Sequence, residues 1–286
     1  MSEHVRIYEV GPRDGLQNEN MLIPAARKIE LIDRLSRAGF EKIEATSFVS
    51  PKWVPQLADA EAVLAGIKRR PGTDYAALTP NMKGYERALA AGVDEVAVFA
   101  SASEGFSQKN INCSIAESLK RFEPLLEAAK SDGMRVRGYV SCVIACPYDG
   151  PVAPGAVRDV AGALFDMGCY EISLGDTIGA GTPETVSTML KAVLPGLPAD
   201  RLAGHFHDTH DNALDNVAAA LDLGLRVFDS AVGGLGGCPY APGAKGNLAT
   251  GPLVAFLEKA GFDTGIDHDA LAEAEQYLRS ITKASA

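Results

Sequence analysis

Short apolar runs alternate with longer amphipathic stretches along this chain, and this alternation constrains its fold more than any other feature. Most of the runs are continuously apolar, which is typical of parallel strands covered on both faces. Several of the stretches between them end in glycine, the usual stop for a helix. The strand-like runs are residues 5–10, 42–49, 75–78, 95–100, 135–143, 170–174, 201–207 and 226–231, and the stretches with helical periodicity are 25–38, 82–91, 115–131, 157–167, 183–193 and 212–223.

Eight strand–helix repeats in 286 residues predict an α/β fold of the (β/α)8 or TIM barrel type. We expect one catalytic domain over residues 1–286, with one or two closing helices after Gly251. A doubly wound sheet is the alternative, but it needs a glycine-rich phosphate-binding turn after the first strand. The sequence Gly-Pro-Arg-Asp-Gly at 11–15 is not such a turn.

Composition excludes several classes of protein. The net charge of −10 argues against non-specific nucleic-acid binding, which requires a basic surface. No apolar run is long enough for a membrane span, and the N-terminus does not resemble a signal peptide. We therefore expect a cytoplasmic protein with neither a nucleic-acid nor a membrane partner. Four of the five cysteines are expected to be buried thiols that act as small apolar residues: Cys113, Cys142, Cys146 and Cys169.

Unusual polar residues follow the predicted strands at their carboxyl ends. In TIM barrels the carboxyl ends of the strands carry the chemistry, so side chains distant in sequence are expected to converge there. These residues are Arg13 and Asp14 after the first run, Glu44 on the second, Asp176 after the sixth, His205 and His207 at the end of the seventh, and Cys238 and Asn247 after the eighth.

The pair His205 and His207 indicates a metal site. Residues two apart on a strand point to the same face, so both rings can reach one ion. Asp14 would add a carboxylate and Asn247 an amide oxygen. This mixed nitrogen and oxygen set suits Mg²⁺ or Mn²⁺ and does not resemble a thiolate-rich zinc site.

Three further residues have alternative interpretations. Arg13 is expected to be catalytic, with a structural ion pair at the bottom of the barrel as the alternative. Glu44 is either a buried partner of Arg13 or a residue that positions a metal-bound water, and a supporting role around the metal is favoured. Cys238 lies in the glycine-rich segment 233–240, which is expected to be a gating loop that delivers a thiol rather than an ordinary mobile loop.

Several segments together resemble the 3-hydroxy-3-methylglutaryl-CoA lyases, which are divalent-metal lyases of the TIM-barrel metallolyase group. The matches extend over nearly the whole chain. They are residues 10–19, IEATSFVSPKWVP at 43–55, KNINCS at 109–114, RGYVSC at 137–142, GCYEISLGDTIG at 168–179, residues 205–209 and GLGGCPYAPGAKGNLAT at 234–250.

The resemblance implies specific roles for the site residues. It implies cleavage of the acyl-CoA substrate 3-hydroxy-3-methylglutaryl-CoA to acetyl-CoA and acetoacetate in leucine breakdown. It also implies a homodimer. The residues that match the family's metal ligands are Asp14, His205, His207 and Asn247. By the same resemblance, Arg13 would stabilise the enolate oxygen and Cys238 would transfer a proton. Glu44 and Asp176 would support the site. Two candidates remain for the general base that removes the hydroxyl proton, namely Asp176 and a metal-bound hydroxide.

Other functions remain open at this point. Departures from the family pattern at Asn20, at 210–212 and at Lys245 would permit a related substrate, such as citramalyl-CoA or a longer 3-hydroxyglutaryl-CoA derivative. A Claisen-condensing synthase of the same barrel group is a second alternative, although such enzymes are usually longer. A catalytically silent metal-binding barrel is the third.

Overall fold

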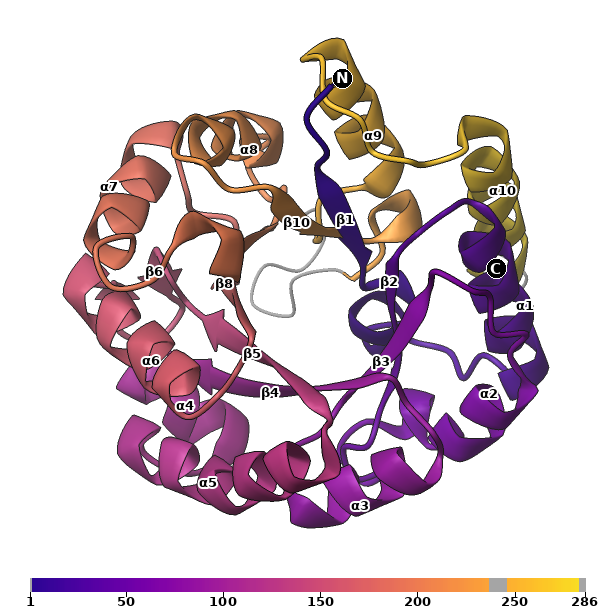
Figure 1. Cartoon of the computed structure of the whole chain (residues 1–286), viewed down its shortest axis with the longest axis horizontal. Helices are drawn as coiled ribbons and strands as arrows, with labels where there is room; N and C mark the ends of the chain where they lie inside the picture. The colour runs from indigo at the N-terminus through magenta and orange to yellow at the C-terminus, as the bar shows by residue number, and fades with distance from the viewer. Residues whose placement is uncertain (1, 237–245, 283–286) are drawn as a thin grey trace. The chain divides into compact units, whose positions relative to one another are not determined.

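The structure is a computed structural model of the chain, and it describes residues 2–236 and 246–282 (Figure 1). Its main sheet has the cyclic strand order β1-β10-β9-β8-β5-β4-β3-β2, which closes it into a barrel. The strand pairs β1–β2, β2–β3, β5–β8, β8–β9 and β9–β10 are parallel. The predicted (β/α)8 barrel is therefore confirmed.

The chain divides into two compact units, which are described separately. The first consists of residues 2–95, 230–236 and 247–282, and the second of residues 96–229 and Gly246. The first unit contains β1 (Arg6–Glu9), η1 (Gly11–Gly15), α1 (Ala25–Arg37), β2 (Lys42–Ser47), η2 (Pro55–Leu57), α2 (Ala60–Gly66), β3 (Asp74–Leu78), α3 (Met82–Ala90), η4 (Val232–Gly234), α9 (Thr250–Lys259) and α10 (His268–Thr282).

The second unit contains most of the remaining strands and their helices. Strands β4 (Glu95–Ser101) and β10 (Val227–Ser230) each have one end residue in the first unit. The other elements are α4 (Glu104–Ile111), α5 (Ile115–Asp132), β5 (Arg135–Ser141), β6 (Ala145–Cys146), β7 (Gly150–Pro151), α6 (Pro154–Asp166), β8 (Glu171–Asp176), α7 (Pro183–Val193), η3 (Ala199–Arg201), β9 (Leu202–Phe206) and α8 (Ala213–Asp222).

All eight predicted strands and all six predicted helices are present, with ends that differ by a few residues. The two closing helices are α9 and α10, and α10 packs against α1 within the first unit (Figure 1). Elements that the sequence did not predict are α2, α4 and the two-residue strands β6 and β7, which pair as an antiparallel hairpin.

Local capping explains why the longest helix has its observed ends. The Ser114 hydroxyl accepts a hydrogen bond from the Glu117 backbone N–H, and the Glu117 carboxylate accepts one from the Ser114 backbone N–H. This capping box satisfies backbone donors that a helix start leaves unpaired. Gly133 ends α5 at φ 68°, a left-handed conformation that glycine adopts without a steric penalty.

The cysteines of the described chain are buried and free. Cys142 and Cys146 pack with Phe106 and Val152 in an apolar cluster, and Cys113 and Cys169 are also buried. Burial raises the pKa of both Cys142 and Cys169 to about 12, so these thiols stay protonated at neutral pH. All four thiols are buried, as predicted, but Cys146 is more than a small apolar residue, because its Sγ accepts hydrogen bonds from the Ser103 hydroxyl and from the backbone N–H groups of Tyr148 and Asp149.

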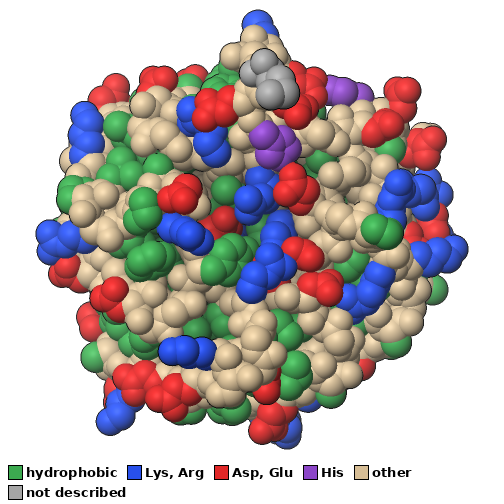
Figure 2. All heavy atoms as spheres, viewed as in Figure 1, with side chains coloured by type: hydrophobic (Ala, Val, Ile, Leu, Met, Phe, Trp, Pro, Cys, Tyr) green, Lys and Arg blue, Asp and Glu red, His purple; other side chains and the backbone are tan. Residues whose placement is uncertain are grey.

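Two further features concern the surface charge and the apolar character of the helices. On the face drawn in Figure 2, Lys and Arg side chains lie among Asp and Glu side chains. Among the described helices, none combines the length and the apolar character that a membrane span requires.

Glu9 is a buried carboxyl group that joins three segments of the first unit. Its Oε1 accepts hydrogen bonds from the backbone N–H of Gly11 (2.8 Å) and of Val232 (2.9 Å), and its Oε2 accepts one from the Thr250 hydroxyl (2.7 Å). Glu9 thereby links the end of β1 to η4 and to the first residue of α9. Burial raises the pKa of Glu9 to about 7 even though these hydrogen bonds act to lower it.

The raised pKa of Glu9 predicts a pH-dependent stability. Because the native pKa is about 7 and the unfolded value about 4.5, the native state keeps a proton in this window that the unfolded chain has released. Stability is therefore highest below the unfolded pKa and falls as pH rises through the native pKa, by about 3 kcal/mol in total. Glu9→Gln removes the titration, and its amide nitrogen can donate to the Thr250 hydroxyl.

Urea unfolding at about pH 5 and about pH 8 tests this prediction. The wild-type free energy of unfolding should fall between the two pH values by about 2.5 kcal/mol more than that of Glu9→Gln. The same fall in both proteins would contradict the account of Glu9.

Candidate active site

Arg13 and Asp14 lie on a tight turn that directly follows β1. The turn η1 is a π-helical segment with a proline in its first positions. The backbone N–H groups of Arg13, Asp14 and Gly15 all point to the Val10 carbonyl oxygen, at 3.1, 2.7 and 3.3 Å. Pro12 has no N–H that would need a partner here. The turn thus fixes two charged residues at the carboxyl end of a buried strand.

The Arg13 guanidinium lies between two carboxylates. Its Nε donates to Glu44 Oε2 at 2.5 Å, and its Nη1 donates to Asp14 Oδ1. Arg13 is buried and Glu44 is fully buried on β2. The sequence left open whether Glu44 pairs with Arg13, and the structure shows that it does. This pairing orients the guanidinium, and it does not test the supporting role of Glu44 around a metal.

Asp14 and Asn247 contact each other within the first unit. The Asn247 Nδ2 donates to Asp14 Oδ2 at 2.7 Å and to the Leu235 carbonyl oxygen at 3.1 Å. The Gln17 side chain donates to Asp14 Oδ1 at 2.9 Å. Because the amide nitrogen of Asn247 makes these contacts, its oxygen is the atom that can serve as a ligand. A carboxylate and an amide predicted as ligands therefore lie side by side.

His205 and His207 form a second pair of predicted ligands, in the second unit. Both are buried at the carboxyl end of β9, and their ring centroids are 5.5 Å apart with the rings tilted by 41°. The two-residue spacing predicts this neighbouring arrangement. The His205 Nδ1 is 3.1 Å from Asp229 Oδ2.

Asp176 anchors the loop that follows β8. Its Oδ1 accepts a hydrogen bond from the Ala180 backbone N–H (3.1 Å), and its Oδ2 accepts one from the Gly181 N–H (2.7 Å). A Cβ atom at position 181 would lie 2.8 Å from Asp176 Oδ2, so glycine permits this approach. Burial raises the pKa of Asp176 above its usual range. A higher pKa strengthens the carboxylate as a base, whereas the two backbone donors favour an anchoring role.

Sequence reasoning missed a buried ionic network beside His205. Arg137 on β5 is fully buried and donates to Asp229 on β10 and to Glu171 on β8. Burial alone would raise the pKa of Asp229, but the Arg137 charge and the His205 hydrogen bond outweigh it and hold that pKa well below its usual range. The sequence did place a charged residue within each of three predicted strands. These residues are Arg137, Glu171 and Asp229.

Two predicted residues lie outside the described part of the chain, namely Cys238 and Lys245. Among the other positions that depart from the family pattern, Asn20, His210 and Asp211 are exposed, and Asn212 directly precedes α8.

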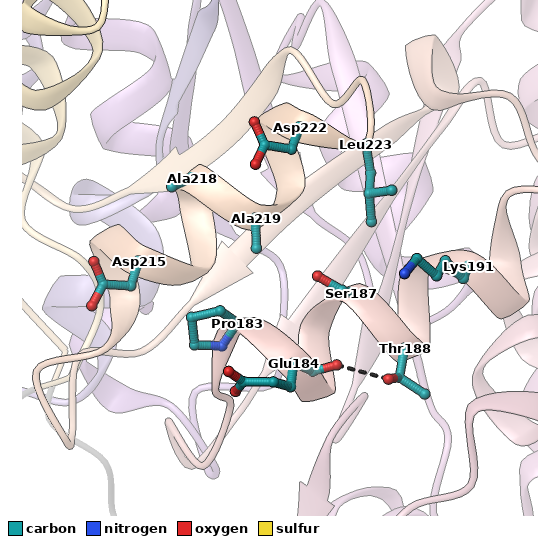
Figure 3. Close-up of a pocket in the computed structure, with 10 residues that line it drawn as sticks. All are labelled: Pro183, Glu184, Ser187, Thr188, Lys191, Asp215, Ala218, Ala219, Asp222 and Leu223. Carbon is teal, nitrogen blue, oxygen red and sulfur yellow. Dashed lines mark hydrogen bonds between the residues drawn. The ribbon is translucent and has the colours of Figure 1, made fainter.

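A surface pocket between α7 and α8 does not coincide with the predicted site (Figure 3). Its walls come from successive turns of the two helices, and the Thr188 hydroxyl on one wall donates to the Glu184 carbonyl oxygen. None of the lining residues is a predicted site residue. They are Pro183, Glu184, Ser187, Thr188, Lys191, Asp215, Ala218, Ala219, Asp222 and Leu223.

Comparison with known proteins gives consistent matches over nearly the whole chain. A family model described as HMGL-like matches residues 4–278. The 3-hydroxy-3-isohexenylglutaryl-CoA/hydroxy-methylglutaryl-CoA lyase of Pseudomonas aeruginosa is 57% identical over 281 residues, which cover 98% of this chain and 94% of that protein. The mitochondrial hydroxymethylglutaryl-CoA lyase of Bos taurus is 57% identical over 276 residues, covering 96% and 85%.

A solved structure extends this agreement to the fold. The crystal structure of the HMG-CoA lyase from Brucella melitensis matches with a TM-score of 0.97 and 60% sequence identity, covering 99% of this chain and 100% of that one. Because sequence and structure agree over nearly the full length, this chain belongs to the HMGL-like family.

Proposed function

We propose that this chain is a carbon–carbon lyase that cleaves 3-hydroxy-3-methylglutaryl-CoA to acetyl-CoA and acetoacetate. The observation that carries the proposal is the 57% identity, over 98% of the chain, to a relative named as a hydroxy-methylglutaryl-CoA lyase. The charged and polar side chains at the carboxyl ends of β1, β2 and β9 are of the types that such a reaction needs. The whole chain acts in this proposal as one TIM-barrel catalytic domain.

A divalent cation, Mg²⁺ or Mn²⁺, is the proposed cofactor. Asp14, His205 and His207 could each offer it one ligand atom. Asn247 would add its amide oxygen, since its amide nitrogen already donates to Asp14. One carboxylate, one amide oxygen and two imidazoles form a donor set that fits these ions. When bound, the cation would polarise the substrate oxygens and make its hydroxyl group easier to deprotonate.

Arg13 is the proposed stabiliser of the negative oxygen that forms as the carbon–carbon bond breaks. Its Nε and Nη1 are held by Glu44 and Asp14, so the guanidinium is oriented before substrate binds. A preorganised cation in a buried site stabilises developing charge strongly, because it need not reorganise during the reaction. Asp176 is the candidate base for the hydroxyl proton, and Cys238 is proposed to return a proton to the acetyl-CoA carbanion.

The test of the proposed function is cleavage of 3-hydroxy-3-methylglutaryl-CoA by the purified full chain. Acetoacetate release would be followed with added Mg²⁺ and with excess EDTA. Turnover that the chelator abolishes supports the reaction and its metal dependence together. No acetoacetate from a folded, Mg²⁺-supplied protein would refute the proposal.

A longer 3-hydroxyglutaryl-CoA derivative is a second candidate substrate. The relative from Pseudomonas aeruginosa is named for 3-hydroxy-3-isohexenylglutaryl-CoA as well as for the methyl compound. Comparing kcat/KM for the two acyl-CoA compounds distinguishes a lyase for the methyl substrate from one that also accepts the longer chain. No comparable observation favours citramalyl-CoA, a Claisen-condensing synthase or a silent barrel.

The remaining proposals concern the cellular compartment, the oligomeric state and the pathway of the enzyme. We propose that it is a cytoplasmic protein and, by likeness to the family, a homodimer that acts in leucine breakdown. The relative from Bos taurus is named mitochondrial and one from Danio rerio is named cytoplasmic, so named members of the family differ in compartment. Light scattering on the purified chain tests the dimer directly.

The role proposed for Arg13 makes a specific prediction. Arg13→Met should lower kcat by about 10²- to 10³-fold, because the oriented donor to the developing oxyanion is lost. Arg158→Met is the matched control. Arg158 is exposed, and its ion pair with Asp159 at the surface contributes little to stability. Steady-state kinetics, with circular dichroism as a check on folding, measure the effect. Wild-type turnover in a folded Arg13→Met protein would remove Arg13 from the reaction.

A further inference from the structure

The network around Arg137 reaches the proposed metal ligand His205 through one carboxylate. Arg137 is fully buried, and its Nη1 and Nη2 donate to Asp229 Oδ2 and Oδ1 at 3.0 and 2.7 Å. The Ser173 hydroxyl donates to the same Oδ2 at 2.7 Å. The Asp229 carboxylate is itself fully enclosed at 2% exposure. A buried carboxylate with a two-pronged arginine contact is held in one orientation.

The contact between Asp229 and His205 has a defined direction. An ionised carboxylate can only accept hydrogen bonds. Because Asp229 Oδ2 lies 3.1 Å from His205 Nδ1, that ring nitrogen must carry the hydrogen. The lone pair of a neutral His205 then lies on Nε2, on the opposite side of the ring.

The ring of His205 is also restrained from the side. Tyr139 packs edge-on against it, with centroids 6.3 Å apart and an interplanar angle of 84°. The Tyr139 hydroxyl accepts a hydrogen bond from Arg137 Nη1 at 3.0 Å. The same arginine thus fixes both the carboxylate that contacts His205 and the aromatic ring that packs on it.

We propose that Asp229 is a positioning residue that holds His205 in the Nδ1–H tautomer and so presents Nε2 to the divalent cation. The inference rests on the proposed function, because it takes His205 as a metal ligand. Carboxylates that accept from the second nitrogen of a metal-bound histidine orient the ring and strengthen it as a ligand. Asp229 contacts neither substrate nor metal in this proposal.

The tautomer can be observed in the wild-type full chain without metal or substrate. Nitrogen-15 NMR of the histidine rings, at a pH where they are neutral, reports which nitrogen carries the hydrogen. The His205 signals are identified by their absence in His205→Gln. Hydrogen on Nδ1 is the expected result, and hydrogen on Nε2 would overturn the proposal.

A pair of variants tests the consequence for metal binding. Both Asp229 oxygens accept from Arg137, so in Asp229→Asn the new NH2 group faces an Arg137 N–H whichever oxygen it replaces. Because arginine cannot accept a hydrogen bond, the side chain must leave its present position beside His205. Mn²⁺ affinity, measured by the EPR signal of the free ion, should fall about 10- to 100-fold. Glu171→Gln is the matched control, because Glu171 Oε1 accepts from Arg137 Nε at 2.7 Å and the substitution perturbs the same arginine.

The control variant should keep Mn²⁺ affinity close to that of the wild type. Equal losses in both variants, or wild-type affinity in a folded Asp229→Asn protein, would overturn the proposal. If Asp229→Asn does not fold, the wild-type tautomer decides the question. Neither measurement uses substrate, so a failure to cleave 3-hydroxy-3-methylglutaryl-CoA would refute the proposed function without bearing on Asp229.

Discussion

The pairing of two buried arginines with carboxylates is the constraint on which the proposed site depends. Transfer of a charged side chain out of water is costly, and removing one partner of a buried ion pair typically costs about 3–5 kcal/mol. In the first unit Arg13 is matched by Glu44 and Asp14, and in the second Arg137 is matched by Asp229 and Glu171. Each arginine therefore fixes the orientation of a carboxylate that adjoins a proposed ligand or is one.

The sequence was sufficient to predict the barrel because its signal is repeated along the chain. Continuous apolar runs such as residues 75–78 became parallel strands, and residues 183–193 became α7 with unchanged ends. Short elements were missed for physical reasons. The helix α4 has no apolar stripe along one face, and the strands β6 and β7 are too short to show any periodicity.

The candidate site was only partly predictable for a different reason. Arg13 and Asp14 were recognised because they are adjacent in sequence, and His205 and His207 because they are two residues apart. Both features are local in the sequence. The role of Asp229 depends on contacts with Arg137 and Ser173, which lie 92 and 56 residues away in sequence. Such contacts exist only once β5, β8 and β10 are in place. The contact between Glu44 and Arg13 likewise joins residues 31 positions apart in sequence.

Asp176 would serve both the fold and the proposed reaction. Its two backbone hydrogen bonds fix the loop after β8, while burial makes its carboxyl group easier to protonate. Buried carboxylates with raised pKa values are common among catalytic acids and bases. Anchoring and proton transfer are compatible here, since a carboxylate has more than one lone pair on each oxygen.

The central proposal is that Asp14, His205, His207 and Asn247 are ligands of a divalent cation. The most direct test is the stoichiometry of Mn²⁺ bound by the full chain and by His207→Ala, measured by equilibrium dialysis. One tightly bound Mn²⁺ per wild-type chain, lost in a folded His207→Ala protein, is the predicted result. Unchanged binding in that variant would contradict the account.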